Sequence, residues 1–201
     1  MRRALRRWQL HDWHVRKTPL VAQDDGTHID VPKHSAVIRD VPGGLPIALG
    51  TIGRRNTPIQ NEELADLIMR ILSLISVDFV DAGYTGLGEQ VFLVCDIPSG
   101  FVVISDQPTK PPTRGDFEVV AVNRHDGGAL WFHVVPRGTW KTALRPLFDP
   151  RSADPPATRA LKEHALSSTR LRHNASRAGI ATKLRADLRL DREGGGPLRD
   201  L

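Results

Sequence analysis

Two β-rich runs joined by an Asp-Gly turn constrain the fold more than any other feature of this sequence. Residues 117–123 and 129–135 are rich in valine and aromatic side chains, and His125-Asp-Gly-Gly128 lies between them. An Asp-Gly pair in this setting favours a β-hairpin, because both residues tolerate the left-handed backbone of a tight turn. The segment therefore predicts two antiparallel strands.

Other short apolar runs extend this pattern along the chain. Turns are predicted at 23–27 and 41–46, and the glycine-rich residues 83–88 separate two further strands. The proline-rich residues 107–115 predict an exposed loop. The remaining predicted strands are residues 35–39, 47–52, 77–82, 90–97 and 101–105.

One segment has clear helical periodicity. Between residues 61 and 75, leucine and isoleucine recur at helical spacing, which predicts an amphipathic helix packed on a sheet. Asn61 is a favourable N-cap, and Glu62 and Glu63 follow in the first turn, where the helix dipole favours acidic groups. Thr139 similarly predicts the start of a short helix that carries Trp140, Leu144, Leu147 and Phe148.

The last quarter of the chain differs in composition. Residues 149–156 indicate a linker, Thr158 to about Leu190 favours helix, and residues 193–197 predict a disordered end. Hairpins without helical crossovers favour antiparallel pairing. We therefore predict an α+β fold, with an antiparallel β-meander packed with an amphipathic helix and followed by a basic helical C-terminal tail. The predicted division is an N-terminal arm at 1–20, a core domain at 21–150 and the tail at 151–201.

Charge is segregated along the chain. Residues 1–20 contain six Lys or Arg and one acidic residue, and residues 151–201 contain eleven and six. Residues 21–150 contain eleven basic and sixteen acidic residues. Basic ends attract polyanions through phosphate contacts, but they also occur as simple solubilising tails. Both interpretations remain open at this point.

Arginines interleaved with aromatic residues are typical of single-strand binding, in which cations contact phosphates and rings stack on bases. Trp8 and Trp13 accompany the N-terminal arginines. The candidate nucleic-acid-binding residues are Arg2, Arg3, Arg6, Arg7, Trp8, Arg170, Arg172, His173, Arg177, Lys183 and Arg185.

Other chemistry finds little support in the sequence. Cys95 lies in an apolar run, which favours a buried core residue over a nucleophile. His11 and His14 have a spacing that would place both imidazoles on one side of a helix, but no third metal ligand is evident. Residues 83–88 lie between strands rather than before a helix, so they do not form a phosphate loop. His125-Asp126 is explained as turn chemistry.

These observations predict a protein without enzymatic activity, cofactor or metal. No apolar run approaches the ~20 residues of a membrane span, and no signal-peptide core follows the basic N-terminus. We therefore expect a cytoplasmic protein that has no membrane partner. The opposite charges along the chain also lead us to expect homo-oligomers.

Several short motifs, taken together, resemble a known family. The chain is similar to the phage/plasmid-like protein family, a domain of unknown function found in bacteriophages, plasmids and prophages. The family's Arg-Val-Val-Cys-x-Asn-Thr block is reduced here to residues 136–142, and this chain begins close to the family's Trp-x-Val region. The motifs that carry the resemblance are Trp13–Leu20, Val37–Arg39, Leu49–Gly53, Asn56-Thr-Pro-Ile-Gln-Asn61, Ala82-Gly83, Gln90–Phe92, Asn123-Arg-His-Asp-Gly127 and Leu171–His173.

The resemblance implies a protein of phage or mobile-element origin. The predicted order of helix, antiparallel meander and helix is also similar to the core of single-strand annealing recombinases, an analogy of fold alone. The leading hypothesis is a protein that binds single-stranded DNA as a recombination or annealing accessory. The alternative is an oligomeric protein-interaction or host-modulating module without nucleic-acid affinity.

Overall fold

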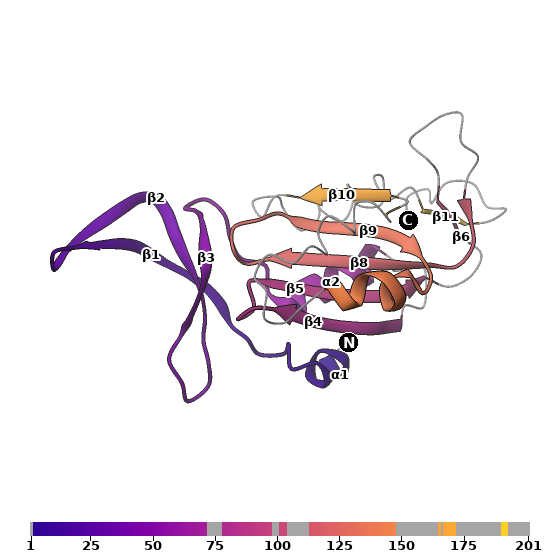
Figure 1. Cartoon of the computed structure of the whole chain (residues 1–201), viewed down its shortest axis with the longest axis horizontal. Helices are drawn as coiled ribbons and strands as arrows, with labels where there is room; N and C mark the ends of the chain where they lie inside the picture. The colour runs from indigo at the N-terminus through magenta and orange to yellow at the C-terminus, as the bar shows by residue number, and fades with distance from the viewer. Residues whose placement is uncertain are drawn as a thin grey trace.

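A long antiparallel sheet forms the centre of the molecule (Figure 1). In this computed structural model the residues described are 2–71, 78–97, 101–103, 113–147, 165, 167–171 and 190–192. The central sheet has the strand order β10-β9-β8-β5-β4. Its strands are β4 (Asp78–Thr85), β5 (Gln90–Ile97), β8 (Phe117–Arg124), β9 (Leu130–Pro136) and β10 (Ser167–Leu171).

Both faces of the central sheet are covered, so its inner strands bury apolar side chains on both sides. Along β5, Val91, Leu93 and Cys95 belong to one core cluster, while Phe92 and Val94 belong to another. This division follows from the alternation of side chains along a strand. Helix α2 (Asn61–Ile71) contributes to the first cluster, and the short helix η1 (Trp140–Leu144) contributes to the second.

Helix α2 begins one residue earlier than its predicted cap implies. Gln60 occupies the N-cap position, because its carbonyl accepts the first helical hydrogen bond from Leu64 at 3.0 Å. The Glu63 carboxylate accepts a hydrogen bond from the Gln60 backbone N–H at 2.9 Å, which is half of a capping box. The predicted N-cap, Asn61, lies inside the helix, and its side-chain amide instead donates to the carbonyl of Leu10 at 2.9 Å.

The N-terminal residues form a short helix, α1 (Arg2–Arg7), and then contribute to the core. Its C-terminus closes in a Schellman motif: Leu10 N–H donates to the Leu5 carbonyl at 2.9 Å, and Gln9 N–H donates to the Arg6 carbonyl at 3.1 Å. Leu5 and Leu10 are both buried, as this motif favours. Trp13 is also buried, so much of the first twenty residues packs against the folded body.

A second sheet projects from one end of the central sheet (Figure 1). It has the order β1-β2-β3 and consists of β1 (Val15–Asp24), β2 (Thr27–Arg39) and β3 (Ile47–Gly53). Residues 34–39 of β2 pair with β3, whereas residues 27–30 pair only with β1. The outer part of the β1–β2 hairpin is therefore a two-stranded ribbon, and we call residues 19–32 the ribbon.

Two glycines allow the second sheet to dock on the β8–β9 turn. A Cβ atom added at Gly50 would lie 2.4 Å from the Cα atom of Asp126. A Cβ atom at Gly127 would lie 2.1 Å from the carbonyl oxygen of Thr51. Only residues without a side chain permit two backbones to approach this closely. The predicted Asp-Gly turn is thus also the contact point between the two sheets.

The structure confirms that an antiparallel meander packs with an amphipathic helix. It corrects the predicted α+β class, because the described residues are mainly β, with few helices. The predicted helix over Thr158–Leu190 is wrong at Ser167–Leu171, which forms strand β10 beside β9. An open edge of β9 provides a pairing partner that helix-favouring composition does not reveal. Most of the predicted tail lies outside the described residues.

Smaller predictions also need correction. The run at 101–105 does not extend the central sheet: β6 (Phe101–Val103) pairs with β7 (Thr113–Arg114) and β11 (Leu190–Arg192) in a separate sheet. Thr139 makes no side-chain capping bond to η1. Glu118 accepts the Trp140 N–H at 3.0 Å instead. After η1 the chain continues as η2 (Arg145–Leu147).

The predicted turns at 23–27 and 41–46 are confirmed, as are the hairpin at 125–128 and the strands that flank it. The turn predicted at 83–88 lies later, at 86–89, because residues 83–85 belong to β4. No helix in the described part of the chain is long and apolar enough to cross a membrane.

Candidate functional site

Two of the motifs that carry the family resemblance meet at a buried polar junction. The first motif lies just before α2, where Gln60 clamps the start of β1. Its side chain accepts the Val15 N–H at 2.9 Å and donates to the Val15 carbonyl at 2.6 Å. Asn61 holds the adjoining chain through its bond to the Leu10 carbonyl.

The second motif lies at the end of β8. The buried Asn123 amide donates to the carbonyl of Ile59 at 2.8 Å, which joins this hairpin to the first motif. The His125 Nε2 atom lies 3.4 Å from the same amide nitrogen, and the His125 backbone N–H donates to the Glu89 carbonyl at 2.7 Å.

This junction connects the N-terminal segment, α2 and the β8–β9 hairpin. Its side chains bond mainly to backbone carbonyls and N–H groups, which a buried backbone requires. The Oδ1 atoms of Asn61 and Asn123 are buried and make no hydrogen bond to any described group. The arrangement positions chain segments, and His125 and Asp126 serve the hairpin as the turn chemistry predicts.

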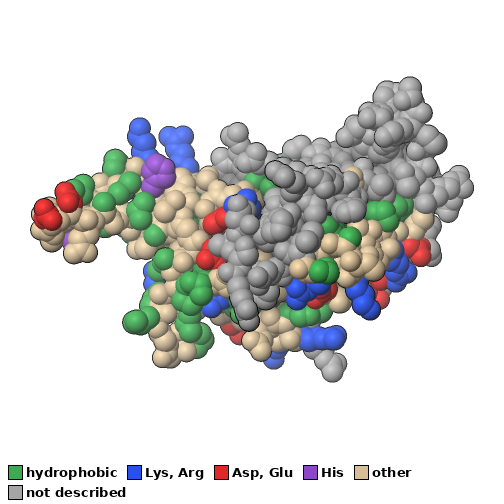
Figure 2. Space-filling view, in the orientation of Figure 1, with side chains coloured by type: hydrophobic (Ala, Val, Ile, Leu, Met, Phe, Trp, Pro, Cys, Tyr) green, Lys and Arg blue, Asp and Glu red, His purple; other side chains and the backbone are tan. Residues whose placement is uncertain are grey.

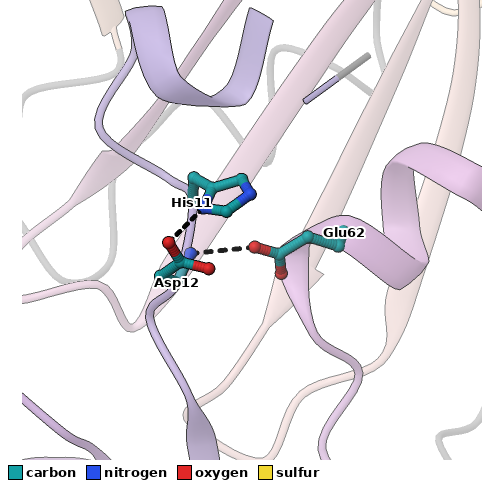
Figure 3. A group of neighbouring side chains, drawn as sticks. All are labelled: His11, Asp12 and Glu62. Atoms are coloured by element: carbon teal, nitrogen blue, oxygen red, sulfur yellow. Dashed lines mark hydrogen bonds and ion pairs between the residues drawn. The ribbon is translucent and has the colours of Figure 1, made fainter. Parts of the chain in front are cut away.

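A second polar group lies at the surface, where the loop after α1 meets the start of α2 (Figure 3). His11 Nδ1 lies 2.5 Å from the Asp12 carboxylate, and the Asp12 N–H donates to Glu62 at 2.9 Å. One potential ligand atom from each of these three residues lies within 4.8 Å of the others. Each group already has a partner that accounts for its position, so the cluster is explained without a metal.

His11 and His14 do not share a site. Both lie in the non-helical segment between α1 and β1, so their predicted position on one side of a helix is wrong. His14 instead bonds to Asp40 at 2.6 Å. Cys95 is fully buried, as predicted, and burial together with the nearby Asp96 raises the pKa of its thiol.

The N-terminal candidates for nucleic-acid binding lie on and just after α1. Arg6 and Arg7 are exposed, and Trp8 is half-buried against the core. The Arg7 guanidinium lies 5.4 Å from the centre of the Trp8 ring, a cation–π distance. Arg2 and Arg3 belong to α1, but their side chains lie outside the described part. Trp13, which the sequence groups with Trp8, is buried and lies under Arg39 at 4.2 Å.

The C-terminal candidates are placed only in part. Arg170 lies in β10 opposite Trp131 of β9, and its side chain is not among those described. The residues that lie outside the described ranges are Arg172, His173, Arg177, Lys183 and Arg185.

Sequence reasoning missed a third group of cations, at the root of the ribbon. Lys33, Arg54 and Arg55 are exposed, and none lies within ion-pair distance of a described carboxylate. The Arg54 N–H donates to the Lys33 carbonyl at 2.8 Å, which holds the two segments together. Lys17 joins them, because its ammonium donates to the Arg54 carbonyl at 2.9 Å. We call Lys17, Lys33, Arg54 and Arg55 the basic root.

Three of these four cations, Lys33, Arg54 and Arg55, belong to residues 21–150, whose negative net charge hides them. Arg54-Arg55 after a predicted strand was the available signal, but Lys17 and Lys33 join it only through strand pairing. Figure 2 shows Lys and Arg side chains beside a histidine near the root, and acidic side chains at the far end of the ribbon.

Two other exposed cations, Arg16 and Arg137, have acidic partners. Arg16 lies 3.1 Å from Asp40, and Arg137 pairs with Asp96. Hydrogen bonds from Arg16 and then His14 hold the pKa of Asp40 below its ordinary value, and the bond to Asp96 raises the pKa of Arg137. The basic root and the Arg6–Arg7 pair differ from these cations because they remain available for an external anion.

Comparison with known proteins adds no further constraint. No family model matches the chain, and searches of curated proteins and of solved structures find no significant match.

Proposed function

We propose that this protein binds single-stranded DNA, as a non-enzymatic recombination or annealing accessory that originates from a phage or another mobile element. The observation that carries the proposal is the set of exposed cations without acidic partners, at α1 and at the basic root. Cations that are separated on the surface favour a flexible polyanion as ligand, because a single nucleic-acid strand can bend to contact each of them.

Trp8 supports a single strand over a duplex. Its ring is half-exposed beside Arg7, so a base can stack on the aromatic face while the guanidinium contacts a phosphate. Bases in a duplex are already stacked and do not present a free face. The origin in a mobile element rests on the motif resemblance alone.

Fluorescence anisotropy with a labelled oligonucleotide tests the proposal. We expect Arg54→Glu with Arg55→Glu to weaken binding at low salt by about tenfold or more, since each lost phosphate contact removes a favourable ionic interaction. Arg6→Glu with Arg7→Glu should weaken it similarly, and Trp8→Ala should weaken it by roughly 1–3 kcal/mol if one base stacks there.

Lys141→Glu is the control for net charge. Lys141 is exposed on η1, remote in the chain from both cation groups, and its reversal makes the same change per residue. It should have a markedly smaller effect on the dissociation constant. Equal losses per reversed charge in the three charge variants would show a general charge effect and would contradict a defined interface.

A further inference from the structure

The ribbon is an exposed element without a packing partner in the described structure. Every residue from Val21 to Asp30 is exposed, including Val21 at 44% and Ile29 at 48%. An isolated two-stranded ribbon is marginally stable in water, and its outer strand edges present unpaired backbone groups. Exposed β-branched side chains on such an element indicate a surface that is covered in an assembly.

The ribbon and its root carry opposite charges. Between residues 19 and 32 there are three aspartates and no Lys or Arg. Asp24 and Asp25 lie at the turn and form the acidic end of the ribbon, whereas Asp30 lies opposite Val21, nearer the root. The basic root follows directly at Lys33. Along β1, Asp24 and Lys17 are about 23 Å apart at ~3.3 Å per residue. This exceeds the Debye length of about 8–10 Å at ordinary salt, so the two ends attract each other only weakly within one chain.

From this charge pattern we infer that the ribbon pairs with the ribbon of a second copy of this chain. Two ribbons aligned antiparallel, related by a two-fold axis, place the acidic end of each on the basic root of the other. An interface of this kind is isologous, because one surface patch with two opposite charges is complementary to itself. The exposed Val21 and Ile29 lie between the charged ends and would be covered by the partner.

The charge of the ribbon argues against nucleic acid as its occupant. A β-ribbon is narrow enough to enter the major groove, but three aspartates would face the phosphates there. The same aspartates favour a basic protein surface, and this chain supplies one at its own root.

The bend at the root gives the ribbon a defined direction. The β1–β2 register shifts between Pro19 and Val21, and the opposite residue Lys33 has a left-handed backbone with φ of 68°. The Arg54 N–H bond to the Lys33 carbonyl fixes this bend. The ribbon therefore projects away from the central sheet (Figure 1), where a second copy can reach both of its edges.

Sedimentation velocity of the full chain, without nucleic acid and in low salt, tests the inference through a charge swap. One variant carries Asp24→Lys and Asp25→Lys, and the other carries Arg54→Glu and Arg55→Glu. Each variant alone should dimerise at least about tenfold more weakly than the natural chain, because like charges then meet. An equimolar mixture should recover the dimer, since the altered ends are again complementary.

The control Asp66→Lys changes an exposed residue of α2 and should leave the dimer unchanged. A natural chain that stays monomeric would overturn the inference, as would a dimer that neither variant weakens or a mixture that fails to recover. Failure of oligonucleotide binding by the natural chain leaves this test unaffected.

Discussion

At the scale of single residues, the polar side chains of the junction act on backbone groups. Asn123 illustrates this, since its buried amide donates to the Ile59 carbonyl. Asn123→Ala should lower the free energy of unfolding by about 1–3 kcal/mol, because that carbonyl is then left buried without its donor. Chemical denaturation gives the value. Gln23→Ala, at an exposed position of the ribbon, is the control and should change stability by less than ~0.5 kcal/mol.

The burial of Cys95 predicts how fast its thiol reacts. It is fully buried, its thiol pKa is raised by burial, and the thiolate is the reactive form. Alkylation in the native state should therefore be at least about 100-fold slower than in denaturant, since reaction requires the core to open. Mass spectrometry over time measures both rates. Comparable rates would contradict the placement of Cys95 in the core.

At the scale of elements, the contact between the two sheets depends on glycine. Gly127 has φ of 97°, and a Cβ atom there would overlap the Thr51 carbonyl. Gly127→Ala should destabilise the fold by about 2–4 kcal/mol, since strain and overlap add. Gly43→Ala is the matched control, because Gly43 also has a positive φ but has open space. It should cost only the strain of about 1–2 kcal/mol. Thermal unfolding of both variants separates the two terms.

The pair between Asp40 and Arg16 ties the end of β2 to β1 and predicts a pH dependence. The pKa of Asp40 is lowered in the folded state by Arg16 and His14. Its stabilising contribution is therefore full above the ordinary value of about 3.9 and is lost as pH falls through the lowered pKa. Asp40→Asn should lower Tm slightly near neutral pH. The difference from the natural chain should shrink at pH values below about 4.

Local sequence patterns correctly predicted individual hairpins and helices, but they did not predict which distant strands pair. The hairpin around His125 and the periodic part of α2 are encoded by nearby residues, so the sequence indicated them correctly. Strand β10 depends on the free edge of β9, more than thirty residues earlier. The basic root likewise depends on pairing between β1, β2 and the end of β3. Long-range pairing leaves no local pattern, which explains both omissions.

At the scale of the whole molecule, the structure changes the meaning of charge segregation. The acidic average of residues 21–150 hides three cations, Lys33, Arg54 and Arg55, which join Lys17 of the basic N-terminal segment in the basic root. Asp24, near the end of the ribbon, is about 23 Å from Lys17 along β1. The proposed account uses each part: exposed cations bind a nucleic-acid strand, and the acidic end binds a second copy. The two activities would compete for Arg54 and Arg55.

The dependence of oligonucleotide affinity on salt tests the central claim most directly. The account predicts a measurable complex at low salt, with log Kd rising linearly with log salt at about 0.7 per phosphate contact on a single strand. The Arg54→Glu/Arg55→Glu variant should reduce that slope by about 1.4 if both residues contact phosphates. No binding at low salt, or an affinity indifferent to salt, would contradict the account.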